Sequence, residues 1–130
     1  MDEALREVLL ADERIAYALL FGSMARGDTT PSSDVDVAIG LRSGATFDLH
    51  DIGGLIFELQ RAVGRDVDVV ILNEAPPGLA YRIFRDGRLL VEKDRRARVE
   101  RQVRAILDYL DYEWVERRCT RGVLERAARG

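Results

Sequence analysis

The stretch from Leu19 to Leu41, LLFGSMARGDTTPSSDVDVAIGL, contains two apolar runs separated by a small, polar loop. The first run, residues 15–21, ends at Gly22 and predicts a buried strand. The second, residues 34–41, alternates carboxylates and apolar residues at its start and predicts another strand. Side chains two residues apart in a strand point to the same side, so Asp34 and Asp36 should share one face. Two carboxylates in an otherwise apolar strand need a physical reason.

A second carboxylate pair, Asp66 and Asp68, opens the next predicted strand, residues 66–72. If the two strands are neighbours, Asp34, Asp36 and Asp68 can converge. Carboxylates about 6 Å apart repel by roughly 3 kcal/mol per pair at an effective dielectric of about 20. A cation would relieve this repulsion, and oxygen ligands without histidine favour Mg²⁺ or Mn²⁺. The alternative is that these are strand-end aspartates facing water, which is the commoner explanation of an isolated Asp-x-Asp.

The residues before the first carboxylate pair favour a phosphate site. Gly22 permits an unusual backbone angle or the close approach of a phosphate. Ser23 offers a hydroxyl and an amide, and the following amides can form a nest or a helix N-terminus. Arg26 can reach phosphate oxygens. Residues 24–33 are predicted as a loop or one helical turn. A phosphate cradle joined by a short loop to metal-binding carboxylates indicates nucleotidyl transfer.

The rest of the chain supplies elements that would surround such a site. Helices are predicted at residues 2–10, at 49–63 before Gly64, at PGLAYRIFRD before Gly87 and at about 94–127, with a further strand at 88–92. Asp94 is the expected N-cap of the last helix. Its apolar face is marked by Val99, Val103, Ile106, Leu107, Leu110, Trp114 and Val115. The chain therefore predicts a single α/β (α+β) domain over residues 1–130.

Composition excludes several classes of protein. Cys119 is the only cysteine and His50 the only histidine, so an internal disulfide and a histidine-rich metal site are excluded. No apolar run is long enough for a membrane span, and no signal peptide is recognised. We therefore expect a cytoplasmic protein. Residues 1–87 carry a net charge of −7 and residues 88–130 one of +4. This split fits a solvated final helix or a basic arm that meets an oppositely charged partner.

Gly22-Ser23, ten further residues and then Asp34-Val35-Asp36 resemble the signature of the DNA polymerase β-like nucleotidyltransferases. The string G-S-M-A-R-G, the S-D-V-D and the later D-V-D-V-V-I-L are similar to the minimal nucleotidyltransferase (MNT) subgroup. The resemblance continues through PGLAYRIFRDGRLLVE and the long terminal helix, so it covers nearly the whole chain.

The resemblance implies a small mixed β-sheet flanked by helices, with a long C-terminal helix. It implies that Gly22 and Ser23 hold the phosphates of ATP, with Arg26 as a further phosphate ligand. Asp34, Asp36 and Asp68 would be both catalytic residues and ligands of two Mg²⁺ ions, with Mn²⁺ also possible. Asp68 is preferred to Asp66 as the third carboxylate by motif alignment, and the choice stays open.

The MNT subgroup also implies a partner. Its members look like MntA-type antitoxins of HEPN–MNT pairs, which transfer AMP from ATP onto a tyrosine of a HEPN RNase toxin. The alternatives are a non-catalytic antitoxin that masks the toxin by binding, and a small-molecule nucleotidyltransferase. Docking is expected around Tyr81, Phe84, Trp114 and the terminal helix, although core packing would also explain these aromatic residues and is favoured for Trp114. Neither a membrane nor a directly bound nucleic acid is expected.

Overall fold

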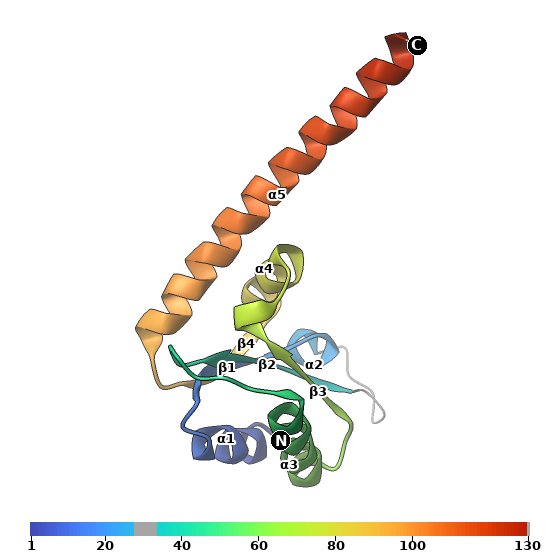
Figure 1. Ribbon diagram of the computed structural model, residues 1–130. Coiled ribbons are helices and arrows are strands. Elements are labelled where there is room, and N and C mark those ends of the chain that lie inside the picture. The colour runs from blue at the N-terminus through green and yellow to red at the C-terminus, as the bar shows by residue number, and fades with distance from the viewer. Residues whose placement is uncertain (28–33, 130) are drawn as a thin grey trace.

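The computed structural model describes residues 1–27 and 34–129, and the side chains of the last helix only in part beyond Asp111. It contains a four-stranded sheet in the order β3-β2-β1-β4 (Figure 1). The strands are β1 (Ile15–Phe21), β2 (Val35–Leu41), β3 (Val67–Ile71) and β4 (Arg88–Glu92). The helices are α1 (Asp2–Ala11), α2 (Ser23–Arg26), α3 (Leu49–Val63), α4 (Pro77–Asp86) and α5 (Arg95–Arg129), with a 3₁₀ turn at Leu72–Glu74.

The sheet is mixed, as expected. β1 pairs antiparallel with β2 and with β4, whereas β2 and β3 run parallel. Helix α3 lies between β2 and β3 in the chain, as the crossover between parallel strands requires. The parallel pairing places the starts of β2 and β3 together at one end of the sheet.

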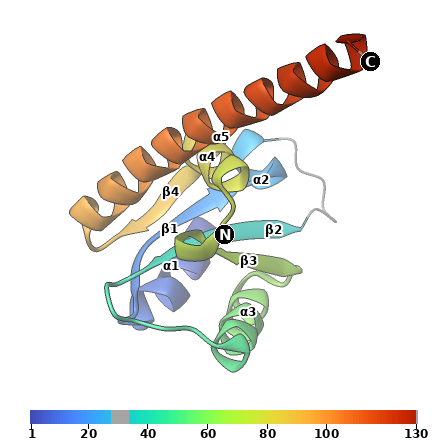
Figure 2. The same cartoon turned by 45° about the horizontal axis from the view of Figure 1, so that its top comes forward.

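Helices cover both faces of the sheet. Apolar side chains of α1 and α3 pack on one face, against residues such as Leu20, Val37 and Ile39. Helix α4 and the first turns of α5 pack on the other face, against Tyr17, Leu19 and Ala38 (Figure 2). Successive strand residues point to opposite faces, so β1 and β2 need apolar residues at nearly every position. Both strands are buried along almost their whole length.

Tyr17 is the largest fully buried side chain, and its ring lies over Gly40 of the neighbouring strand. A Cβ atom at position 40 would collide with that ring, so the packing of β1 on β2 depends on this glycine. Burial raises the pKa of the Tyr17 hydroxyl to about 12, although the charges of Arg101 and Arg98 lower it.

The attachment of α5 to the sheet is specific. Asp94 caps the helix, as expected, because its Oδ1 accepts a hydrogen bond from the amide of Ala97 at 3.0 Å. Arg98 pairs with Glu92 of β4, and Nε of Arg101 donates to the carbonyl of Leu72 at 2.9 Å. Helix α5 is 35 residues long, and its C-terminal part extends beyond the rest of the molecule (Figure 1).

Two expectations need correction. Residues 72–74 form a 3₁₀ turn rather than the end of a strand, and Asp34 and Asp66 directly precede their strands. Phe84 is 8 % exposed and packs against Tyr17 in the core, so it cannot serve as a docking residue. The side chain of Trp114 and residues 28–33 lie outside what the structure describes. None of the helices in residues 1–27 and 34–129 combines the length and the apolar character that a membrane span requires.

Candidate active site

The strand register brings two of the predicted carboxylates side by side. Asp36 is the partner of Phe21 in β1 and of Asp68 in β3. Paired residues of neighbouring strands lie about 5 Å apart and point to the same face of the sheet. For Asp36 and Asp68 this is the face covered by α4 and α5, since Ala38 and Val70, two residues further along each strand, pack into that core.

Gly22 lies directly against Asp36. Its φ of 71° and ψ of −151° belong to a backbone conformation that side chains other than hydrogen rarely allow. A Cβ atom at position 22 would also collide with Oδ2 of Asp36. The glycine is therefore required twice, for the turn out of β1 and for the space that the carboxylate occupies. The expected proximity of the Gly-Ser turn to the carboxylates is found.

Helix α2 begins at Ser23 immediately after this turn and is a single helical turn. Met24 anchors it in the core, and Gly27, with a φ of 80°, ends it. The first amides of a helix have no acceptor within the helix, so the amides around Ser23 can donate to an anion. Ser23 is half-buried and Arg26 exposed.

The electrostatics of Asp36 reflect its neighbours. Burial raises the pKa of Asp36, and the negative charges of Asp68 and Asp34 raise it further, while the charge of Arg26 lowers it. Asp34, Asp68 and Arg26 therefore all act on one carboxylate. Asp34 is exposed at the edge of the site, and Asp68 is exposed as well.

Asp66 occupies a different position from Asp68. It precedes β3, and its backbone carbonyl accepts a hydrogen bond from the amide of Val35 at 2.9 Å. Its backbone thus helps to align β2 with β3. The register places Asp68, not Asp66, opposite Asp36, and Asp68 is the residue of the pair whose charge raises the pKa of Asp36.

An aromatic stack beside α4 was not recognised in the sequence. Tyr81 of α4 and Tyr109 of α5 stack with ring centroids 4.2 Å apart and planes 4° apart. The guanidinium of Arg85 lies 5.6 Å from the centroid of Tyr81 and also pairs with Asp86 at 2.8 Å. Tyr81 and Tyr109 are 28 positions apart in the sequence and give no local sequence signal, so only the packing of α4 on α5 reveals the stack.

Comparisons with known proteins identify the family and the fold of the chain. The family Polymerase beta, Nucleotidyltransferase matches residues 3–96. The chain belongs to the polymerase β nucleotidyltransferase family. The candidate protein adenylyltransferase MJ0435 of Methanocaldococcus jannaschii is 32 % identical to this nucleotidyltransferase over 79 residues, which are 61 % of this chain and 83 % of the relative.

Two solved structures share the fold of the nucleotidyltransferase over 95 % of its length. One is a toxin–antitoxin crystallised with AMP-PNP, with a TM-score of 0.80, 22 % identity and 98 % of the matched chain covered. The other is a Shewanella oneidensis complex of a tri-AMPylated HEPN toxin with an MNT antitoxin, with a TM-score of 0.73, 21 % identity and 99 % coverage. The expected fold is confirmed.

The nucleotidyltransferase has the carboxylate oxygen ligands that Mg²⁺ prefers, but they are not assembled into a metal site. Asp36 and Asp68 supply adjacent carboxylate oxygens whose repulsion a cation would relieve. Among the described residues, no three His, Cys, Asp or Glu side chains come together closely enough to hold a metal as they stand. The exposed Asp34 and Asp68 would have to turn toward Asp36. The residues therefore fit Mg²⁺ in their chemical kind.

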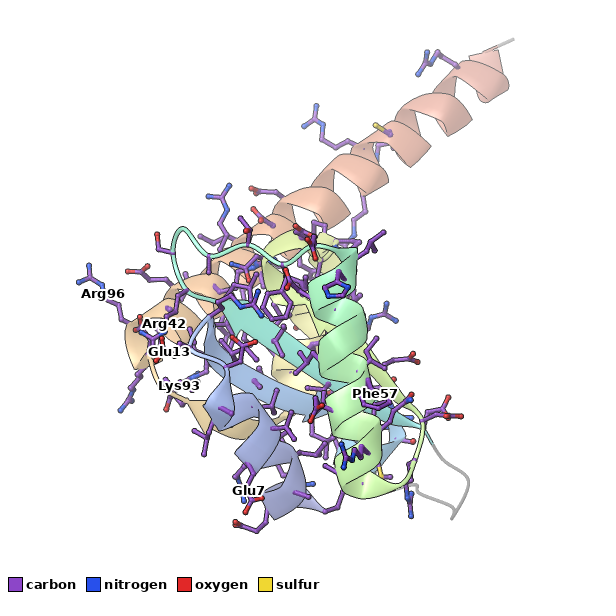
Figure 3. All side chains as sticks on the ribbon, turned by 60° about the horizontal axis from the view of Figure 1, so that its bottom comes forward. Glu7, Glu13, Arg42, Phe57, Lys93 and Arg96 are labelled. Atoms are coloured by element: carbon purple, nitrogen blue, oxygen red, sulfur yellow. The ribbon has the colours of Figure 1, made fainter. Side chains whose placement is uncertain are left out.

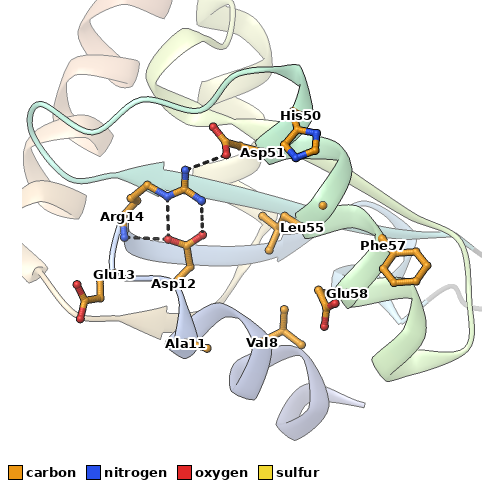
Figure 4. A pocket seen from close by; sticks show the side chains of 11 residues that line it. Val8, Ala11, Asp12, Glu13, Arg14, His50, Asp51, Leu55, Phe57 and Glu58 are labelled. Atoms are coloured by element: carbon orange, nitrogen blue, oxygen red, sulfur yellow. Dashed lines mark hydrogen bonds and ion pairs between the residues drawn. The ribbon is translucent and has the colours of Figure 1, made fainter.

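A separate pocket of about 720 Å³ lies between α1 and α3 of the nucleotidyltransferase (Figure 4). Arg14 crosses it, pairing with Asp12 at 3.0 Å and with Asp51 at 3.1 Å. This pocket lies on the opposite face of the sheet, near the start of β1, whereas the carboxylates lie near the end of that strand. His50 lines it, so the only histidine of the chain is remote from the candidate active site, as expected.

Proposed function

We propose that this chain is an antitoxin that transfers AMP from ATP onto a tyrosine of a HEPN toxin. The observation that carries the proposal is the direct pairing of Asp36 with Asp68 beside the Gly22 turn, within a polymerase β nucleotidyltransferase domain. A relative that is 32 % identical is named as a candidate protein adenylyltransferase. The fold of 95 % of the chain, which includes most of helix α5, matches chains from toxin–antitoxin complexes.

Each residue has a role in this proposal. The backbone at Gly22 and the amide and hydroxyl of Ser23 bind the β- and γ-phosphates, and Arg26 neutralises phosphate charge. Asp34, Asp36 and Asp68 would hold two Mg²⁺ ions, with Mn²⁺ as a substitute. When bound, the ions lower the pKa of the attacking hydroxyl and neutralise the departing pyrophosphate.

The reaction is a substitution at the α-phosphorus of ATP. The tyrosine oxygen forms a bond to that phosphorus, and the bond from phosphorus to the bridging oxygen of the β-phosphate breaks. Pyrophosphate leaves with the bonding electrons. The hydroxyl proton goes to water or to the neighbouring carboxylate of Asp68, which lies exposed at the strand start. Negative charge develops on the tyrosine oxygen as its proton leaves, close to the negatively charged phosphates of ATP, which explains the value of a cation and of Arg26.

The test is intact-mass spectrometry of the cognate HEPN toxin after incubation with the chain, ATP and Mg²⁺. Adducts of the mass of AMP, located on a tyrosine by peptide mapping, are expected. The double variant Asp34→Asn, Asp36→Asn should give none, while Asp66→Asn, a matched change one strand away, should transfer AMP at the wild-type rate. Neutralisation of the toxin without an adduct would instead establish masking. Transfer to a small molecule but not to the protein would contradict the proposal as well.

A further inference from the structure

Helix α5 carries an apolar stripe that lies in solvent. Its members recur at intervals of three and four residues and therefore share one side of the helix. They are Val99, Val103, Ile106, Leu107 and Leu110, which are 39, 49, 39, 52 and 54 % exposed. Among the described residues, this stripe contains half of the exposed large apolar side chains. An apolar surface of this kind on a soluble chain marks an interaction site.

The opposite side of α5 holds the helix to the body. Ala105 is fully buried in the core with Ala97 beside it, Arg101 bonds the carbonyl of Leu72, and Tyr109 stacks on Tyr81. The side chains of the stripe are about half exposed and belong to neither hydrophobic core cluster. Burying it would stabilise a complex by about 25 cal/mol for each square ångström of apolar surface removed from water.

The family match and the structural matches differ in how much of α5 they include. The family match ends at residue 96, the second residue of α5. The match to the chains from toxin–antitoxin complexes covers 95 % of this chain and so includes most of α5. The helix is thus the part that this chain shares with complex-forming chains beyond the catalytic domain.

Charge around the stripe favours a partner of the opposite sign. Residues 88–130 carry a net charge of +4. Arg96 and Arg104 border the stripe with side chains that are 89 % and 72 % exposed, and each pairs with an acidic residue one turn further along α5, Glu100 and Asp108. Arg96 points away from the body at the start of α5 (Figure 3). Such a rim steers an acidic surface toward the helix and helps to fix its orientation.

We infer that the apolar stripe of α5 is the docking surface for the toxin, which contributes an apolar patch bordered by acidic side chains. The inference rests on the proposed function, because it takes its partner from there. It deepens that function by separating the surface that binds the toxin from the carboxylates that modify it.

The experiment measures binding without ATP, so that no transfer takes place. The double variant Val103→Asp, Leu110→Asp puts two charges on the stripe. As the control, Phe57→Asp puts the same residue at an exposed apolar position of α3, a helix on the opposite face of the sheet. Binding to the HEPN protein is measured by isothermal titration calorimetry. The stripe variant should raise the dissociation constant by at least about 30-fold, as loss of central interface contacts does. The Phe57 variant should change it far less. Circular dichroism should give the wild-type spectrum for all three proteins, because the substituted side chains lie outside the core.

Several outcomes would overturn the docking surface. They are wild-type affinity of the stripe variant, equal weakening by the Phe57 control, and failure of the wild-type chain to bind the HEPN protein. A wild-type chain that sediments alone as a dimer, and that the stripe variant converts to a monomer, would assign the stripe to a second copy instead. Failure of the proposed function is distinguishable. The wild-type chain could bind the HEPN protein through the stripe and yet add no AMP when ATP and Mg²⁺ are supplied. That result would support the docking surface and contradict the proposed transfer of AMP.

Discussion

The α-carbon of Gly22 faces the carboxylate of Asp36 across the end of the β1–β2 pair, with no room for a Cβ atom between them. The turn proposed to hold the phosphates and the carboxylate proposed to hold the metal are thus in direct contact. Any change in one displaces the other.

Gly22→Ala tests this contact. The new methyl group would meet Asp36, and the positive φ would add strain of about 1–3 kcal/mol. We expect a lower melting temperature and loss of AMP transfer. Gly44→Ala is the matched control for stability, because Gly44 also has a positive φ, of 81°, but has open space around its α-carbon. Equal destabilisation by both changes would mean that strain alone, and not contact with Asp36, makes Gly22 necessary.

Asp36→Asn should stabilise the protein near neutral pH. The pKa of Asp36 is raised in the folded state, first by burial and then by Asp68 and Asp34. The contribution of Asp36 to the free energy of unfolding is therefore fully present at a pH below its pKa in the unfolded chain. It is lost as the pH rises through its pKa in the folded protein. The gain from the asparagine should be present at pH 7 and vanish toward pH 3, as measured by urea unfolding. An asparagine that destabilises the protein at pH 7 in metal-free buffer would contradict this account of the site.

Asp68→Asn and Asp66→Asn should separate the two carboxylates of β3. Asp68 lies opposite Asp36, whereas Asp66 contributes its backbone carbonyl, which asparagine retains. We expect the Asp68 change to lower the rate of AMP transfer by about 100-fold or more, as the loss of a group that stabilises transition-state charge does. The Asp66 change should leave the rate unaltered. If Asp66→Asn lowered the rate and Asp68→Asn left it unaltered, Asp66 would be the third carboxylate of the site.

ATP together with Mg²⁺ should raise the melting temperature of the chain, since a ligand that binds only the folded state stabilises it. The stabilisation is about 2.7 kcal/mol when the free ligand exceeds its dissociation constant 100-fold. The Asp34→Asn, Asp36→Asn variant should lose most of this shift. ATP with EDTA is the control for nucleotide binding alone. An identical shift with EDTA would argue against a metal held by the carboxylates.

Tyr17 should make the fold sensitive to alkali. Burial raises the pKa of its hydroxyl to about 12. The contribution of Tyr17 to the free energy of unfolding is therefore fully present below about pH 10 and is lost as the pH rises through 12. The loss should amount to about 3 kcal/mol or less over this range. Tyr17→Phe should remove most of the slope in unfolding measurements between pH 10 and 12. Tyr81→Phe, a half-buried tyrosine outside the sheet, serves as the control.

Much of this fold follows from local rules. Gly22, Gly64 and Gly87 end their elements where the sequence predicts, because each lies between runs of different periodicity. The pairing of Asp36 with Asp68 could be predicted only conditionally. It depends on β3 lying parallel beside β2, and spacing along the chain does not fix which strands are neighbours.

The partners of an apolar face are harder to predict. The period of α5 identifies Val103 and Leu110 as members of one stripe, but periodicity does not reveal whether a sheet, a partner or water covers it. Phe84 and Tyr81 lie three residues apart on α4, yet one is buried in the core and the other stacks on α5. Only tertiary packing decides such cases.

Asp36, Asp68 and α5 lie on the same side of the sheet, and the bond from Arg101 to Leu72 joins the helix to the segment that follows β3. A protein bound along α5 would consequently be held at a fixed distance from the carboxylates of Asp36 and Asp68. Tethering of this kind replaces free diffusion with an effective concentration that can reach the millimolar range. Under the proposed function, the choice of acceptor would follow from where α5 presents it, and the enzyme would not need to recognise the residues around the acceptor tyrosine.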